Sequence, residues 1–238
     1  MTGVAMVKWA VTPATTATPG SASWIWDWYE AGVVDQFWGD TEEDYSFSVT
    51  FTEECEHTIW VKAIDEVGHY TYTSFDINVD LHGPTVDFVG LVPDPTNEEL
   101  PTELTIHAEE TKGTIVAWEW FFDGPDAGEG QNTVVSIGAA SQAIALTSTT
   151  TILSSDLAAL SEGQHYVFAR AQDAMGNWGK LNWMQFTVDR SDLVVTIEAP
   201  EEGALIATSS VVVSGYAEDS TTAITSMSYR INGGSWTG

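Results

Sequence analysis

Cysteine and basic residues are both scarce in this sequence. Cys55 is the single cysteine among 238 residues, so the chain cannot form an internal disulfide. That suits cytosolic proteins and also extracellular microbial proteins that fold without disulfides. Seven lysines and arginines stand against 35 aspartates and glutamates, which gives a formal net charge of −28. Such a surface repels phosphate backbones and anionic membranes, so we expect no nucleic-acid partner.

Long apolar runs and catalytic motifs are missing as well. No run is long enough to cross a bilayer and no signal-peptide pattern is visible, so we expect no direct membrane insertion. There is no Gly-x-Ser-x-Gly, no phosphate-binding glycine loop and no zinc-type pair. Cys55 lies between Glu54 and Glu56, whose charges disfavour a thiolate nucleophile. The acidic run 42–44 could serve glycoside hydrolysis but is typical of a solvated loop. The sequence predicts no enzyme activity.

What the chain does contain is an internal repeat. The stretch 165–178 (HYVFARAQDAMGNW) has an earlier copy at 57–70 (HTIWVKAIDEVGHY), 108 residues before it. Trp9, Trp120 and Tyr229 occupy corresponding places in three further strand patterns, 111 and then 109 residues apart. A period of about 109 residues is the size of an immunoglobulin-like β-sandwich.

The phase of the repeat predicts three segments. Residues 1–80 form a partial domain that starts at the third-strand position, residues 81–190 form a complete domain, and residues 191–238 form a partial domain of opening strands. The first and last repeats are therefore incomplete. We expect either that the sequence is part of a longer array or that neighbouring molecules supply the missing strands, because an open core beside an unpaired edge is a liability.

Strand patterns dominate the complete repeat. Alternating or aromatic runs predict strands at 85–89, 104–108, 114–122, 165–171 and 183–188. Residues 133–151 suit short middle strands, although 139–146 could be helical. The fold class predicted is all-β: tandem immunoglobulin-like sandwiches joined by short linkers at 80–84 and 189–193.

The turn Ala171-x-Asp173-Ala174-x-Gly176-Asn177 after an aromatic strand resembles the signature of bacterial and archaeal immunoglobulin-like surface repeats, close to fibronectin type III. The hairpin 228–234 (SYRINGG) shares the resemblance, whereas His69 replaces the asparagine in the first copy. Families of this kind build adhesins, surface layers, stalks and spacers of secreted enzymes. The resemblance implies an extracellular or cell-surface location and a structural or adhesive role.

Two sets of carboxylates are candidate calcium ligands. Asp65 and Asp173 lie in the repeated turn, where a carboxylate more often accepts backbone N–H groups than binds calcium, which prefers six to eight oxygens. The domain junctions are the better candidates. Calcium there would link the carboxylates that flank each boundary: Asp80, Asp87, Asp189 and Asp192. The alternative is that these acids are simply solvated; no cofactor is required by the sequence.

Trp24, Trp26 and Trp28 are the candidate ligand-binding residues. On a strand, a spacing of two would place the three indoles on one face. If exposed, that face could stack sugars or dock a partner; the favoured alternative is that the indoles fill the core or an interface. His57 and His165 have no acidic, cysteine or histidine neighbour at metal-ligand spacing, so we interpret them as strand-entry residues.

The function predicted is a structural surface or filament-forming protein: a surface layer, an adhesin stalk or an extracellular fibre. Self-association is the expected partner interaction, with strand complementation between protomers as one hypothesis. The alternative is a carbohydrate-binding or spacer module of a secreted enzyme, with a glycan or surface partner.

Overall fold

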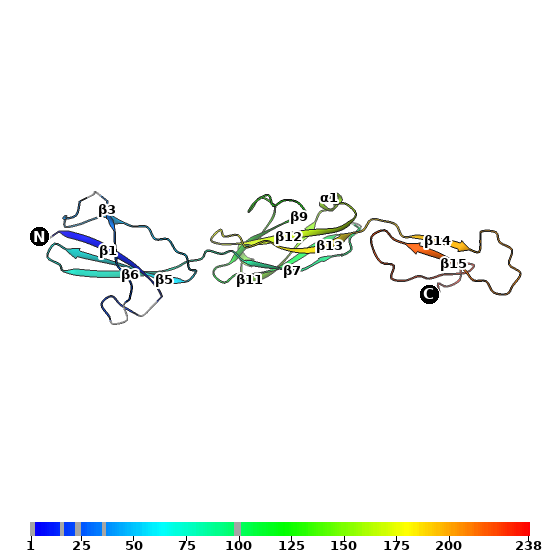
Figure 1. Ribbon diagram of the computed structural model, residues 1–238, viewed down its shortest axis with the longest axis horizontal. Helices are drawn as coiled ribbons and strands as arrows, with labels where there is room; N and C mark the ends of the chain where they lie inside the picture. The colour runs from blue at the N-terminus through cyan, green and yellow to red at the C-terminus, as the bar shows by residue number, and fades with distance from the viewer. Residues whose placement is uncertain (1–2, 15–16, 22–24, 35–36, 98–100) are drawn as a thin grey trace. The chain divides into compact units, whose positions relative to one another are not determined.

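The computed structural model describes residues 3–14, 17–21, 25–34, 37–97 and 101–238. The chain separates into two compact units, Met1–His82 and Gly83–Gly238, which are drawn in Figure 1. The first boundary lies close to the predicted one at residues 80–81. The segment predicted as a third domain lies within the second unit and contributes its last two strands.

The first unit is built on one four-stranded antiparallel sheet. Its strand order is β2-β1-β5-β6, and a small hairpin, β3-β4, lies beside it. The bounds are β1 Val4–Pro13, β2 Tyr29–Glu30, β3 Gly32–Val33, β4 Tyr45–Ser46, β5 Glu56–Asp65 and β6 Tyr70–Asn78.

The second unit contains a two-layered sandwich. One sheet has the order β10-β9-β12-β13 and the other β11-β8-β7, and Figure 1 shows β9, β12 and β13 over β7 and β11. A separate hairpin, β14-β15, follows. The strands are β7 Thr85–Val92, β8 Thr102–Glu109, β9 Ile115–Phe122, β10 Thr133–Ser136, β11 Ala145–Ile152, β12 Gly163–Asp173, β13 Asn182–Val188, β14 Val194–Ala199 and β15 Ser214–Glu218.

The strand order confirms the predicted all-β fold of immunoglobulin-like sandwiches. Side chains alternate along the strands, so each sheet of the complete sandwich turns one apolar face inward. Trp118, Leu104, Ile106, Val167 and Phe186 belong to that core, and all are at most 1% exposed.

Two local expectations need correction. Residues 139–146 are not one helix: a 3₁₀ turn, η1 (Ala139–Ser141), precedes β11, and a short helix, α1 (Ser154–Ala158), lies where none was predicted. Residues 224–231, the predicted strand pattern around Tyr229, do not form a strand. Only Tyr229 is bridged there, to Thr237, because no neighbouring strand offers a ladder to the rest of the run.

Candidate interaction surfaces

The repeated turn binds its own backbone. Asp173 Oδ1 accepts hydrogen bonds from the N–H groups of Met175 (2.8 Å) and Asn177 (2.9 Å), and Asn177 Nδ2 donates to Asp173 Oδ2 at 2.9 Å. Gly176 has φ of +97°, a left-handed conformation that favours glycine. The hydrogen-bonded interpretation of Asp173 is confirmed.

The first unit repeats the same turn with a histidine in place of the asparagine. Asp65 Oδ1 accepts from the N–H groups of Val67 (3.0 Å) and His69 (2.8 Å), and His69 Nδ1 lies 3.1 Å from Asp65 Oδ2. Desolvation raises the pKa of Asp65, but the hydrogen bonds from the His69 backbone, the His69 ring and Val67 outweigh it and leave the pKa below its ordinary value.

His57 and His165 have one shared structural role. Each Nε2 contacts the carbonyl oxygen four residues earlier, Glu53 at 3.0 Å and Ser161 at 2.8 Å. A carbonyl only accepts, so Nε2 carries the proton in both rings. His165 Nδ1 is also hydrogen-bonded to the Asp123 carboxylate. The rings therefore close the loops that lead into β5 and β12, in agreement with their interpretation as strand-entry residues.

Cys55 lies beside His57 without forming a nucleophile–base pair. Its Sγ is 3.3 Å from His57 Nε2, the nitrogen that already donates to Glu53. A protonated nitrogen cannot accept the thiol proton. Gly163 occupies the corresponding place before His165, which keeps the same carbonyl contact. The histidine thus serves the loop whether or not a thiol is present.

Asp189 lies in a hydrogen-bonded cluster at the junction within the second unit. Its carboxylate accepts from Ser191 Oγ (2.9 Å) and Thr222 Oγ1 (2.6 Å). Thr221 Oγ1 donates to Glu162 at 2.6 Å. The pKa of Glu162 lies below its ordinary range, mainly because of the hydrogen bond from Thr221. Burial opposes this shift, and the N–H groups of Arg190 and Ser191 add to it.

The other predicted junction carboxylates differ in exposure and contacts. Asp192 is exposed, Asp80 is half-buried at the end of the first unit, and exposed Asp87 on β7 lies 3.5 Å from Asn182 Nδ2. Within the described ranges, no three acidic, histidine or cysteine side chains are grouped so that they could hold a metal ion. Calcium at the junctions stays a prediction.

The tryptophan stripe is only partly described. Trp24 lies outside the described residues. Trp26 and Trp28 are half-buried, while Ile25 is 82% exposed. The expected alternation is thus present, but residues 25–28 form no strand, and β2 begins only at Tyr29. Glycan binding by Trp24, Trp26 and Trp28 stays a prediction.

A covered ion pair occupies the outer face of the complete sandwich. Arg170 Nε donates to Glu119 Oε1 at 2.6 Å, and Arg170 Nη2 to Asp126 Oδ1 at 3.0 Å. Asn132 Nδ2 donates to the same Asp126 oxygen, and the Trp178 ring lies 5.7 Å from the guanidinium. Hydrogen bonds from Asn132 and Gly128 lower the pKa of Asp126. Burial opposes this effect, and the nearby Arg170 charge adds to it. Loop 123–132 therefore closes over charged side chains.

The same outer face carries a row of aromatic residues that the sequence reasoning missed. Phe121 and Phe168 stack at 5.1 Å, and Tyr166 meets the Trp183 ring edge-on at 5.3 Å. Trp183 is 57% exposed. The period-2 alternation of 164–172 and 182–188 was the available signal, since it places Tyr166 and Trp183 on the face opposite the buried Val167 and Phe186.

The inner face of the first sheet is a second apolar surface. Trp9 stacks on Phe47 at 4.9 Å and on Tyr29 at 5.0 Å, and a small core forms around Val7 and Val61. A hollow of about 360 Å³ opens beside Trp9, between the end of β1, residues 49–53 and His57. Part of this face stays open, since Tyr29 is 55% exposed.

No protein-family model matches the chain, and comparison with curated protein sequences finds no match. Among solved structures, the chain is similar to the fibronectin(III)-like modules of CbhA from Clostridium thermocellum (14% identity, TM-score 0.33, 77% of this chain and 78% of that chain). It is also similar to a tetra-tandem repeat in the extending region of a large adhesion protein (18% identity, TM-score 0.32, 84% of this chain and 45% of that chain). The fold assignment rests on the strand order of the two packed sheets. Among the described residues, no helix has the length and apolarity needed to cross a membrane.

Proposed function

We propose that this chain is a structural protein of the cell surface or extracellular matrix, built as an array of immunoglobulin-like repeats. One observation carries the proposal: successive repeats reproduce the same strand pairing. Val4 pairs with Asp65 and Met6 with Ile64, as Ile115 pairs with Asp173 and Ala117 with Gln172, with a bulge at the same place. A register kept in this detail serves a repeating scaffold.

The polar residues support this role because they serve the scaffold itself. Asp65, Asp173, His57 and His165 all form hydrogen bonds within their own loops. The net charge of −28 keeps such an array soluble and would attract cations in a salt-rich medium. A surface layer, an adhesin stalk and a fibre are the forms that this proposal covers.

Negative-stain electron microscopy of the purified chain, with and without a calcium chelator, tests the proposal. Filaments, sheets or rods that lack glycan binding and hydrolytic activity support it. Loss of regular assemblies in chelator would support calcium at the junctions. Hydrolysis of glycans, esters or peptides at enzymatic rates would overturn the structural assignment.

A carbohydrate-binding module is the alternative, and the exposed Trp183–Tyr166 pair favours it. Aromatic rings on a flat sheet face can stack against sugar rings. In a glycan-binding screen, Trp183→Ala should abolish binding if this surface is used, whereas Trp26→Ala should abolish it if the predicted tryptophan stripe is used. Retention of binding in both variants would reject both surfaces.

A further inference from the structure

The hairpin β14-β15 has the same pairing as β7-β8. Val195 pairs with Ala217 as Val86 pairs with Ala108, and the offset is 109 residues on both strands. The bulge also recurs, between Ile197 and Ala199 in one hairpin and between Phe88 and Gly90 in the other. The last described strands are therefore the opening hairpin of a repeat.

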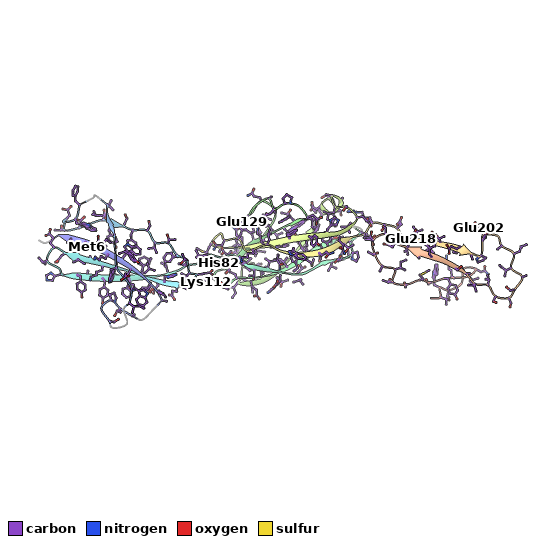
Figure 2. The ribbon with its side chains drawn as sticks, in the orientation of Figure 1. Met6, His82, Lys112, Glu129, Glu202 and Glu218 are labelled. Atoms are coloured by element: carbon purple, nitrogen blue, oxygen red, sulfur yellow. The ribbon has the colours of Figure 1, made fainter. Side chains whose placement is uncertain are left out.

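In the complete sandwich this hairpin covers a sheet. Val86, Leu104 and Ile106 are at most 4% exposed, because they pack across the core against β9, β12 and β13. The counterparts of Val86 and Leu104 lie open: Val195 on β14 is 61% exposed, and Val213, just before β15, is also 61% exposed. Gly215 stands at the position of Ile106. Figure 2 labels Glu202, after β14, and Glu218, at the end of β15. The hairpin thus presents an apolar face with nothing over it among the described residues.

The first unit supplies the matching sheet. Trp9 and Ile77 correspond to Trp120 and Phe186, which the β7-β8 hairpin helps to bury to 3% and 1% exposure. In the first unit, Trp38 and Phe47 pack on part of that face, but Phe75 remains 53% exposed and Tyr29 55%. This face and the last hairpin correspond to the two layers that pack together in the complete sandwich.

We propose that the β14-β15 hairpin of one copy packs across the inner face of β1, β5 and β6 of a second copy. The contact is made by side chains of two facing sheets and adds no strand to either edge. Because the hairpin and the sheet lie in different units, the contact is heterologous and propagates from copy to copy. The inference rests on the proposed structural role and identifies the partner in assembly.

Charge sets the conditions for this association. Each copy carries a formal charge of −28, so copies repel one another at low ionic strength. The paired faces are rich in Val, Ile, Trp, Phe and Tyr side chains, whose burial salt does not weaken. Added salt should therefore strengthen self-association.

Cysteine cross-linking between separately made copies tests the geometry. In the complete sandwich Asn182 Nδ2 donates to the Val86 carbonyl at 2.8 Å; the corresponding positions are Thr73 and Val195. In a Cys55→Ser background, a Thr73→Cys protein mixed with a tagged Val195→Cys protein should form a mixed disulfide on oxidation. Ser74→Cys, on the opposite face of β6, is the matched control. Yields no higher than this control would overturn the proposal.

Sedimentation at several protein concentrations provides the second test. Val195→Asp with Ile197→Asp should weaken association more than about a hundredfold, because both side chains would be buried. Thr196→Asp, on the other face of β14, should leave it nearly unchanged. A chain that stays monomeric yet binds no glycan would overturn the inference and leave the structural role intact. Assembly combined with glycan hydrolysis would overturn the structural role and leave the inferred contact intact.

Discussion

Arg170 and Glu119 form a buried ion pair in the outer layer of the complete sandwich, with Nε and Oε1 2.6 Å apart. Glu119 is fully buried and Arg170 is 6% exposed. The first unit has Lys62 and Lys8 in these two positions, and they face each other in the register of β5 and β1. Lys62 Nζ lies 4.0 Å from the Tyr70 ring centre, and Lys8 Nζ lies 3.9 Å from Glu30. Equivalent positions thus use different interactions.

Removing one member of the buried pair should be costly. We expect Arg170→Met to lower the free energy of unfolding by about 3–5 kcal/mol, because Glu119 would then be buried without its cationic partner. The double variant Glu119→Leu/Arg170→Met should recover most of this loss. Lys62→Met, at the more open equivalent site, should cost less than about 1 kcal/mol. Urea unfolding followed by tryptophan fluorescence measures all three; equal losses in Arg170→Met and the double variant would contradict the account.

The turn carboxylates should differ in importance between the units. Asp173 is 1% exposed and satisfies two backbone N–H groups and one side chain. Asp173→Ala should cost about 1–3 kcal/mol, and hydrogen exchange at the Met175 and Asn177 amides should accelerate. Asp65→Ala should have a smaller effect because its turn is more exposed. Unchanged exchange in Asp173→Ala would contradict the role assigned to the turn.

Acid should remove the stabilisation that Asp126 provides. Its folded-state pKa is lowered, so the unfolded chain binds the proton first. The contribution is complete above the ordinary aspartate pKa of about 4 and is lost as the pH falls through the lower folded value. The difference in urea midpoint between the natural chain and Asp126→Asn should shrink over that range. The changing net charge affects both proteins alike; a difference that grows in acid would refute the assignment.

Gly83 and Gly179 lie in close backbone contact at one end of the sandwich. A Cβ on Gly179 would lie 1.8 Å from the carbonyl oxygen of Pro84. Gly179→Ala should therefore destabilise the second unit by about 1–3 kcal/mol or more. Gly138→Ala is the control: its φ is −60° and nothing lies within 4 Å of the added carbon. Thermal unfolding should separate the two variants, and equal melting temperatures would refute the contact.

Repetition made most of the architecture predictable from sequence. Strands 85–92, 115–122 and 163–173 fall where alternation and the 109-residue period place them. The run 224–231 shows the limit, because a strand pattern needs a neighbouring strand before it becomes a ladder. Trp26 shows another: spacing predicted a shared face but not the backbone at 25–28. The Trp183 surface was missed because exposure depends on which strands pair.

The unlike pairs at Lys8–Lys62 and Glu119–Arg170 bear on how neighbouring repeats fold without exchanging strands. If β1 paired with β12 in error, Arg170 would face Lys8, and Glu119 would remain buried opposite the strand position of Lys62, a point charge without the guanidinium fork. Such an exchange would break the contact of Arg170 with Glu119, which together with Asp126 holds the guanidinium beneath loop 123–132. Misassembly between adjacent similar domains is a characteristic hazard of repeat proteins. The difference in side chains therefore favours pairing of each strand within its own repeat while the chain folds.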